Sequence, residues 1–238
     1  MTPTTDVTQP QNAPEVTRVL VADDDPLVRD AYRALLANQE DFKLVGEALN
    51  GREAIDAYEA LQPSLVLMDL QMPEVSGIEA IQAISSRWPG ACIVALTTFG
   101  TRDYIVAALK AGASGYLLKD IGRRNLLAGM RLALQGELPL SSAVRRELVS
   151  SIVAEEATPV EAVDVGLTPR ERELLVWLAQ GLTNHQIGSQ MFVSEGSVKQ
   201  YLSHIGTKLG VKSRTQILIK AIQLNIVNPH ELPAIGGI

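Results

Sequence analysis

The stretch Val19-Leu-Val-Ala-Asp-Asp-Asp25 joins a run of apolar residues to three consecutive carboxylates. A short apolar run that ends in polar residues is typical of a buried strand whose end lies at a functional edge. Four more runs of similar length follow along the chain, at Lys43–Glu47, Leu65–Met68, Cys92–Leu96 and Gly115–Leu118. The first half of the chain therefore predicts five short strands.

Helix-length segments with apolar residues at three- and four-residue spacings lie between and after these strands. They cover Leu27–Leu36, Gly51–Leu61, Gly77–Ser85, Arg102–Ala111 and Arg123–Gln135. Strands that alternate regularly with helices predict an α/β, doubly wound, five-stranded parallel sheet with helices on both faces. In such sheets the functional crevice lies beyond the carboxyl ends of the strands.

The alternation stops after residue 137. An acidic, proline-bearing stretch follows, with room for a short helix near Ala143–Val153. Thr168–Leu224 then predicts four helices separated by brief turns, which is a small all-α domain. Two of these helices begin at Thr183-Asn-His-Gln-Ile-Gly188 and Ser194-Glu-Gly-Ser-Val-Lys199, and the short turn between them is typical of a helix-turn-helix. We expect a disordered tail over 1–16, an α/β domain over 17–137, a linker over 138–164, the helical domain over 165–228 and a C-terminal tail over 229–238.

The charge of the 238 residues is −6 overall but is unevenly distributed. Residues 1–140 hold 12 basic and 18 acidic side chains, whereas residues 165–238 hold 7 and 4. Only the C-terminal part has the sign that attracts a phosphate backbone. The apolar runs are too short to cross a bilayer, and the single Cys92 forms no intramolecular disulfide. These features predict a cytoplasmic protein without membrane contact.

Polar residues follow four of the predicted strands. Strand one ends in Asp23 and Asp24, strand three in Asp69, strand four in Thr97 and strand five in Lys119. Clustered carboxylates repel one another unless a cation lies among their oxygens, and oxygen-only ligation favours Mg²⁺. A carboxylate nucleophile, a metal, an ammonium and a hydroxyl together suit a phosphoryl group.

The motifs Val21-Ala-Asp-Asp-Asp-Pro26, Val66-Leu-Met-Asp-Leu-Gln-Met-Pro73, Ala95-Leu-Thr-Thr-Phe99 and Gly115-Tyr-Leu-Leu-Lys-Asp120 resemble those of flavodoxin-like receiver domains in bacterial response regulators. The resemblance implies that a sensor histidine kinase phosphorylates Asp69. It implies further roles for the surrounding residues: Mg²⁺ ligands at Asp23, Asp24, Asp69 and the main-chain carbonyl of Gln71, and switch residues at Thr97, Tyr116 and Lys119. Asp25 stands where many relatives have His, which adds a negative charge beside the site.

The C-terminal motifs Leu167-Thr-Pro-Arg-Glu-Arg-Glu173 and Lys208-Leu-Gly-Val-Lys-Ser-Arg-Thr215 resemble the LuxR-type DNA-binding domain, and the whole chain resembles NarL/FixJ-type response regulators. This resemblance implies a transcription regulator that forms a homodimer on activation, with Ser213–Leu224 as the dimer surface. It implies the following DNA contacts: Lys199, Gln200 and Ser203 in the major groove, and Thr183, Tyr201 and Lys208 on the backbone.

Two other functions use similar residues. Aspartate-nucleophile phosphatases also combine a metal with a strand-end Asp, but they typically need a second Asp two residues later, where this chain has Gln71. A receiver-like domain that switches on a ligand without phosphate would not need the set Asp23, Asp24, Asp69, Thr97 and Lys119. The sequence therefore favours a regulator that is not an enzyme.

Overall fold

The computed structural model describes residues 16–98, 102–139, 165–211, 213–224 and 226–227. The N-terminal domain contains one sheet in which the five strands are all parallel, in the order β2-β1-β3-β4-β5. The strands are β1 Thr17–Ala22, β2 Phe42–Ala48, β3 Leu65–Asp69, β4 Ile93–Thr97 and β5 Gly115–Leu118. This order places β1 and β3 side by side, so their carboxyl ends meet at one edge.

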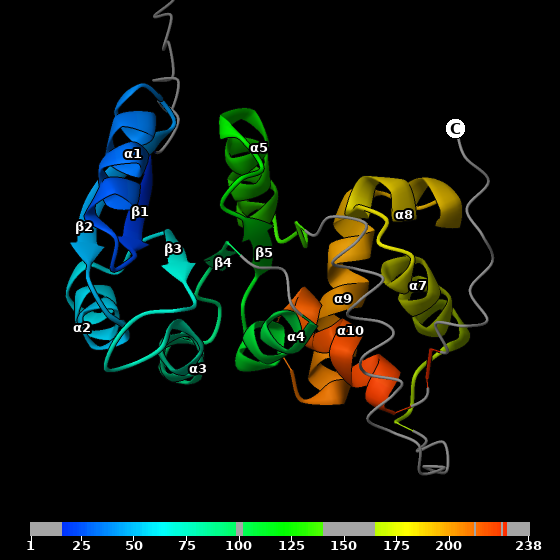
Figure 1. The fold of residues 1–238 in the computed structure, drawn as a ribbon. Coiled ribbons are helices and arrows are strands. Elements are labelled where there is room, and N and C mark those ends of the chain that lie inside the picture. The colour runs from blue at the N-terminus through cyan, green and yellow to red at the C-terminus, as the bar shows by residue number, and fades with distance from the viewer. Residues whose placement is uncertain (1–15, 99–101, 140–164, 212, 225, 228–238) are drawn as a thin grey trace, which may run out of the picture.

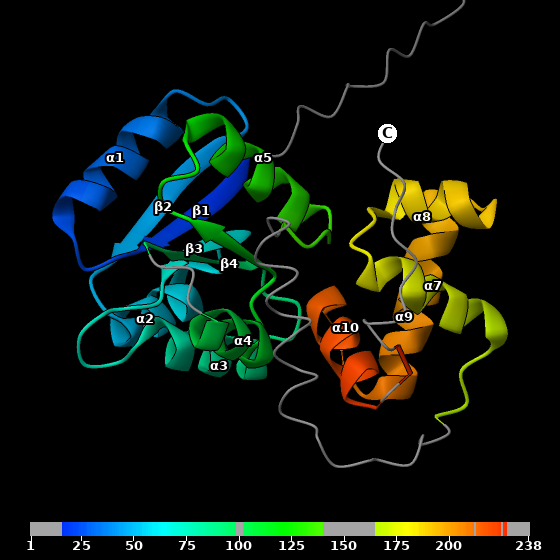
Figure 2. The ribbon, with the colours of Figure 1, turned by 45° about the vertical axis from the view of Figure 1, so that its right-hand side comes forward.

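Helices cover both faces of this sheet (Figures 1 and 2). On one face, α1 (Pro26–Ala37) and α5 (Arg123–Leu134) pack against one set of alternating strand residues. On the other face lie α2 (Gly51–Leu61), α3 (Gly77–Arg87) and α4 (Arg102–Ala111). The strands β3 and β4 are buried along their whole length, as parallel strands with two covered faces must be.

The C-terminal domain consists, in its described part, of α7 (Pro169–Ala179), α8 (Asn184–Met191), α9 (Glu195–Leu209) and α10 (Arg214–Gln223). A hydroxyl side chain caps each helix by accepting a hydrogen bond from the helix's third backbone N–H: Thr168, Thr183, Ser194 and Ser213. The helices α8 and α9 are joined by the short turn at residues 192–194 and form the helix-turn-helix.

The structure confirms the predicted fold class, with strand and helix ends that differ by a residue or two. For example, β2 extends one residue beyond the predicted run at each end, and β4 begins at Ile93 rather than Cys92. The short helix expected near Ala143–Val153 lies outside the described residues.

The two domains are in contact through α4 and α10 (Figures 1 and 2). The apolar cluster on the α2–α3–α4 face of the sheet continues into the core of the helical domain. Ile217, Leu218 and Ile222 of α10 are part of that cluster and are almost completely buried. In this arrangement α10, which the sequence predicts as the dimer surface, packs against a helix of its own chain.

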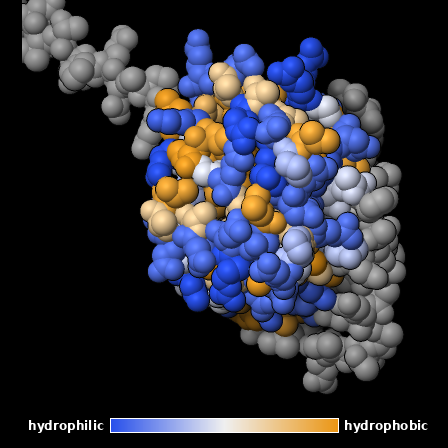
Figure 3. Space-filling view, turned by 60° about the vertical axis from the view of Figure 1, so that its left-hand side comes forward, coloured by the Kyte–Doolittle hydropathy of each residue, from blue (hydrophilic) through white to orange (hydrophobic). Residues whose placement is uncertain are grey.

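The surface view in Figure 3 shows a face on which hydrophilic residues predominate and hydrophobic residues are scattered among them. Across the described ranges, none of the helices has both the length and the apolar content that a membrane span requires.

Candidate functional site

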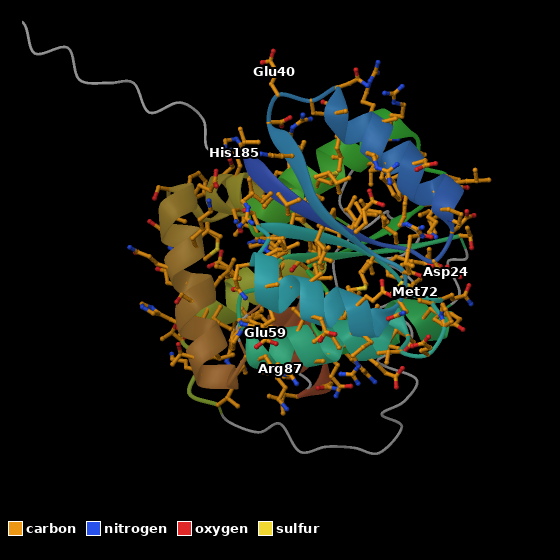
Figure 4. The ribbon with its side chains drawn as sticks, turned by 90° about the vertical axis from the view of Figure 1, so that its left-hand side faces the viewer. Asp24, Glu40, Glu59, Met72, Arg87 and His185 are labelled. Atoms are coloured by element: carbon orange, nitrogen blue, oxygen red, sulfur yellow. The ribbon has the colours of Figure 1, made fainter. Side chains whose placement is uncertain are left out.

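Three carboxylates meet at the carboxyl edge of the sheet. Asp23 follows β1 and Asp69 ends β3, and both are buried, whereas Asp24 is exposed beside them. Figure 4 shows Asp24 at this edge, near Met72. One oxygen from each of the three carboxylates lies within 4.8 Å of the others, as the ligands of one metal ion would. Because all three donors are hard oxygens, the group suits Mg²⁺.

The ammonium of Lys119 lies between the two buried carboxylates. Its Nζ is 2.7 Å from Asp23 Oδ2 and 3.2 Å from Asp69 Oδ1. Burial raises the pKa of Asp69 above its usual value, Lys119 opposes this shift, and the Asp23 carboxylate adds to it. Burial lowers the pKa of Lys119, but Asp23 and Asp69 outweigh it and the net shift is upward. The lysine therefore stays charged and offsets part of the carboxylate repulsion.

The backbone around Asp69 is held in place by close contacts. The Leu70 N–H donates to Asp69 Oδ1 at 2.9 Å, and the Gly77 N–H donates to the Leu70 carbonyl at 3.1 Å. A Cβ atom at Gly77 would lie 1.8 Å from the main-chain oxygen of Asp69. Only glycine permits this approach of α3 to the end of β3.

Thr97 ends β4 at the same edge, and Tyr116 lies within the neighbouring strand β5. Both are buried, with 2% and 1% of their surface exposed. Burial raises the pKa of Tyr116 to about 12, and a hydrogen bond with the Thr97 side chain opposes this. The Lys119 N–H donates to the Thr97 carbonyl at 2.8 Å. Two of the three residues predicted as switch elements, Thr97 and Tyr116, are therefore in direct contact with each other.

Two residues near the edge have contacts that the sequence did not suggest. The Gln71 side chain donates to the Tyr104 hydroxyl at 3.2 Å, and the metal-ligand role of its main-chain carbonyl stays a prediction. The Asp25 side chain caps α1 by accepting from the Leu27 N–H at 2.8 Å. The Asp25 carboxylate therefore stabilises the start of α1.

Two further residues of α1 reach the cluster and were missed by sequence reasoning. Arg29 donates to the main-chain oxygen of Asp23 at 2.7 Å and lies 3.6 Å from Glu47. Tyr32 is buried, and its pKa is raised by burial and by the charges of Asp23 and Asp69. An arginine and a tyrosine at helical spacing carry no sequence signal of their own, so only the packing of α1 identifies them.

The residues predicted to contact DNA lie on α8 and α9. Lys199, Gln200 and Ser203 are exposed along α9, while Tyr201 is partly buried against the core. Lys199 forms an ion pair with Glu195, one helical turn away, at 3.0 Å. Thr183 caps α8. The structure brings the three major-groove candidates onto one accessible stretch of helix.

Lys208 differs from this group. Its Nζ lies 2.7 Å from Glu171 and donates to the Gly166 carbonyl at 2.9 Å, so the side chain joins α9 to the start of α7. The Glu171 side chain is only 5% exposed. A lysine held in this way is not extended toward a DNA backbone. The structure thus gives Lys208 a contact within its own domain, and the phosphate contact expected from the sequence stays a prediction.

Comparison with known proteins agrees with this geometry. The family model of the response regulator receiver domain matches residues 19–131, and that of bacterial regulatory proteins of the luxR family matches residues 165–221. The chain is 37% identical over 205 residues to the nitrate/nitrite response regulator protein NarL of Escherichia coli (strain K12), covering 86% of this chain and 94% of that protein. It is 39% identical over 211 residues to the uncharacterized transcriptional regulatory protein YxjL of Bacillus subtilis, covering 88% and 97%.

Solved structures of regulators are also similar. A two-component response regulator of the LuxR family from Aurantimonas shares 31% identity at a TM-score of 0.54, covering 58% of this chain and 99% of that one. The response regulator RcsB, in a complex with DNA, shares 25% identity at a TM-score of 0.52, covering 87% and 98%. With an acidic receiver edge and a LuxR-type helix-turn-helix in one polypeptide, this chain belongs to the two-component response regulators that regulate transcription.

Proposed function

We propose that Asp69 accepts a phosphoryl group from a sensor histidine kinase, and that the modified protein forms a homodimer and binds DNA. The proposal rests on one observation: Asp69, the buried carboxylate that ends β3, lies beside the carboxylates of Asp23 and Asp24 and the ammonium of Lys119. We also propose that the protein is cytoplasmic, with the receiver domain at 17–137 and the DNA-binding domain at 165–228.

The chemistry is a phosphoryl transfer. An Asp69 oxygen attacks the phosphorus of a phosphohistidine, the new O–P bond forms, and the N–P bond breaks with its electron pair returning to the imidazole. Asp23, Asp24, Asp69 and the Gln71 carbonyl would hold Mg²⁺, which neutralises charge on the phosphoryl oxygens. Lys119 supplies a second cation beside the acceptor oxygen.

Phosphorylation adds negative charge at the edge where Thr97 lies. In the structure the Thr97 hydroxyl forms a hydrogen bond with Tyr116. It is the donor on β4 that can turn toward the new charge. The segment after Thr97 leads into α4, and α4 packs against α10. A change at Thr97 can therefore reach the helix that we propose as the dimer surface.

In the DNA-bound form, Lys199, Gln200 and Ser203 of α9 would contact base edges, and Thr183 and Tyr201 would contact the backbone. The solved complex of RcsB with DNA supports DNA binding in general, because RcsB aligns with 87% of this chain. Dimerisation would link two helix-turn-helix domains that each bind DNA weakly, and the dimer would bind DNA with higher affinity.

Phosphorylation is tested by labelling with acetyl phosphate in the presence of Mg²⁺. We expect wild type to be labelled and Asp69→Asn not. Asp56→Asn, an exposed acidic position on α2, is the control and should label as wild type does. Full labelling of Asp69→Asn would show that another group is the acceptor.

Dimerisation is tested by sedimentation with and without beryllofluoride and Mg²⁺, which imitate the phosphoryl group. We expect a shift from monomer to dimer only when both are added to a protein that retains Asp69. An unchanged mass over the whole concentration range would contradict the proposal.

A further inference from the structure

A cavity of about 1070 Å³ lies between the two domains. The receiver side is formed by segments that precede β4 and β5, and by Glu137 after α5. The other side is formed by α9 and the start of α10, including Lys199, Ser203 and Arg214. Two of the three proposed major-groove residues thus face the receiver domain across this cavity.

At the border of the cavity, the side chain of Glu137 from the receiver domain contacts the helical domain. It is a charged residue with only 8% of its surface exposed. One carboxylate oxygen, Oε1, accepts a hydrogen bond from the Asn184 backbone N–H at 2.7 Å. The other, Oε2, lies 3.4 Å from the guanidinium of Arg214. Burying a carboxylate is costly, and here both oxygens meet partners from the helical domain.

The helical domain builds the surroundings of this carboxylate from its own residues. Asn184 is the first residue of α8, so its N–H points out of a helix N-terminus, where anions are favoured. Arg214 is fixed by hydrogen bonds to the Asn184 side-chain oxygen and to the Leu182 carbonyl. Neither bond involves the receiver domain. An amide and a positioned guanidinium that converge on one point form an anion pocket, and Glu137 is its occupant.

We propose that this pocket binds a phosphate of the DNA backbone, and that Glu137 occupies it in the closed arrangement as an internal substitute for that phosphate. The inference rests on the proposed DNA binding. A carboxylate and a phosphodiester each carry one negative charge and two oxygens suited to an arginine fork. Arg214 lines the same cavity as Lys199 and Ser203, so a duplex seated on α9 would bring its backbone toward the pocket.

Two anions cannot share the pocket. DNA binding and the closed arrangement therefore exclude each other at Glu137, and the affinity of the unphosphorylated protein for DNA is lowered by the share of molecules that are closed. Removal of the Glu137 charge weakens the closed form without altering any group of the helical domain.

The test compares full-length wild type with Glu137→Gln, which keeps the side-chain shape and removes the charge. Glu40→Gln, an exposed acid between α1 and β2, is the matched control. Without phosphorylation, we expect Glu137→Gln to bind duplex DNA roughly tenfold tighter than wild type or more. With beryllofluoride and Mg²⁺, which open the protein, the two should bind almost equally. Equal affinity in the unphosphorylated state would overturn the role of Glu137.

The phosphate role of the pocket is tested separately through Arg214. In the Glu137→Gln background, Arg214→Gln should lower the slope of log affinity against log salt by about one unit. Arg214→Lys keeps the charge and should retain most of the slope, which controls for loss of folding. An unchanged slope in folded Arg214→Gln would overturn the assignment of the pocket to a DNA phosphate.

A third measurement needs no DNA. Inorganic phosphate should shift the NMR signal of the Asn184 amide in Glu137→Gln but not in wild type, where Glu137 fills the pocket. No shift in either protein would count against the pocket. A shift in Glu137→Gln together with no DNA binding by any variant, open or closed, would count against the proposed function and leave the pocket supported.

Discussion

Lys208 either stabilises the helical domain through its contact with Glu171 or contacts a DNA phosphate, and removing Glu171 distinguishes these two roles. The effect on stability can be worked out from the structure. The Glu171 carboxylate accepts from the Thr168 N–H at 2.7 Å and lies 2.7 Å from Lys208 Nζ, with 5% of its side chain exposed. Glu171→Ala removes both interactions. It also leaves the Thr168 N–H without its capping partner.

The two interactions give the expected magnitude. Loss of the capping-box arm costs about 1 kcal/mol, and loss of a partly buried, charge-assisted hydrogen bond costs about 1.5 to 3 kcal/mol. Lys208 recovers some hydration because its side chain is 33% exposed, which favours the lower part of the range. We therefore expect Glu171→Ala to lower the free energy of unfolding of the helical domain by about 2 to 3 kcal/mol.

The assay is urea unfolding followed by the fluorescence of Trp177 on α7, in a Trp88→Phe background so that the receiver domain does not contribute. The control is Glu173→Ala on the same helix. Within the described part of the chain, the Glu173 side chain forms an exposed ion pair with Arg170 and no other, so its loss should cost less than about 0.5 kcal/mol. Lys208→Ala should destabilise the domain about as much as Glu171→Ala, and the double variant little more than either.

The pH dependence has a definite sign. Although burial raises the pKa of Glu171, the hydrogen bonds from Lys208 and Thr168 outweigh it, so the net pKa lies below its ordinary value of 4.5. A depressed pKa contributes stability that is present above 4.5 and is lost as the pH falls through the folded-state pKa. The difference in free energy of unfolding between wild type and Glu171→Gln should become smaller as the pH falls below 4.5. Our reasoning is refuted if Lys208→Ala leaves stability unchanged and instead lowers the salt slope of DNA binding by about one unit.

Three further predictions concern other parts of the chain. Gly77→Ala should destabilise the receiver domain by about 2 to 3 kcal/mol in thermal unfolding, because its Cβ would meet the Asp69 carbonyl oxygen. Gly196→Ala should not destabilise, because its Cβ would meet the Ser194 hydroxyl at 3.7 Å, an ordinary van der Waals distance. Phe192→Gly should raise stability by about 1 kcal/mol, because this 92% exposed residue has a φ of 57°, and a lower midpoint in urea would contradict this. Gln200→Ala should cost about 1 to 3 kcal/mol on a cognate site but spare random DNA, and equal losses on both in competition binding would refute base readout by this residue.

The receiver fold and its acidic edge could be predicted because their signals are local. A strand-sized apolar run followed by a carboxylate places that carboxylate at the sheet edge, and the parallel order of β1 and β3 then brings Asp23 and Asp69 together. The helix starts at Thr168 and Ser213 were equally predictable, because a cap acts on the next three residues.

Contacts between distant segments were not predictable in this way. Lys208 looks like a surface cation on an amphipathic helix, and only the packing of α7 against α9 shows that Glu171 binds it. Glu137 looks like a solvated residue after α5, since nothing near it in sequence suggests that Asn184, 47 positions later, lies on its carboxylate. These pairings depend on how the domains pack, which leaves no periodic trace in either segment.

The proposed acceptor lies at the carboxyl ends of the parallel strands, and the cavity between the domains lies at their amino ends. Asp69 and Thr97 end β3 and β4, whereas the cavity borders segments that precede β4 and β5. Among the described helices that join these ends, α4 follows β4 and packs on α10. If α10 is the dimer surface, it cannot be covered by α4 and by a second α10 at once. Closure and dimerisation then compete for one helix, so mass action predicts that raising the protein concentration opens some chains even without phosphorylation.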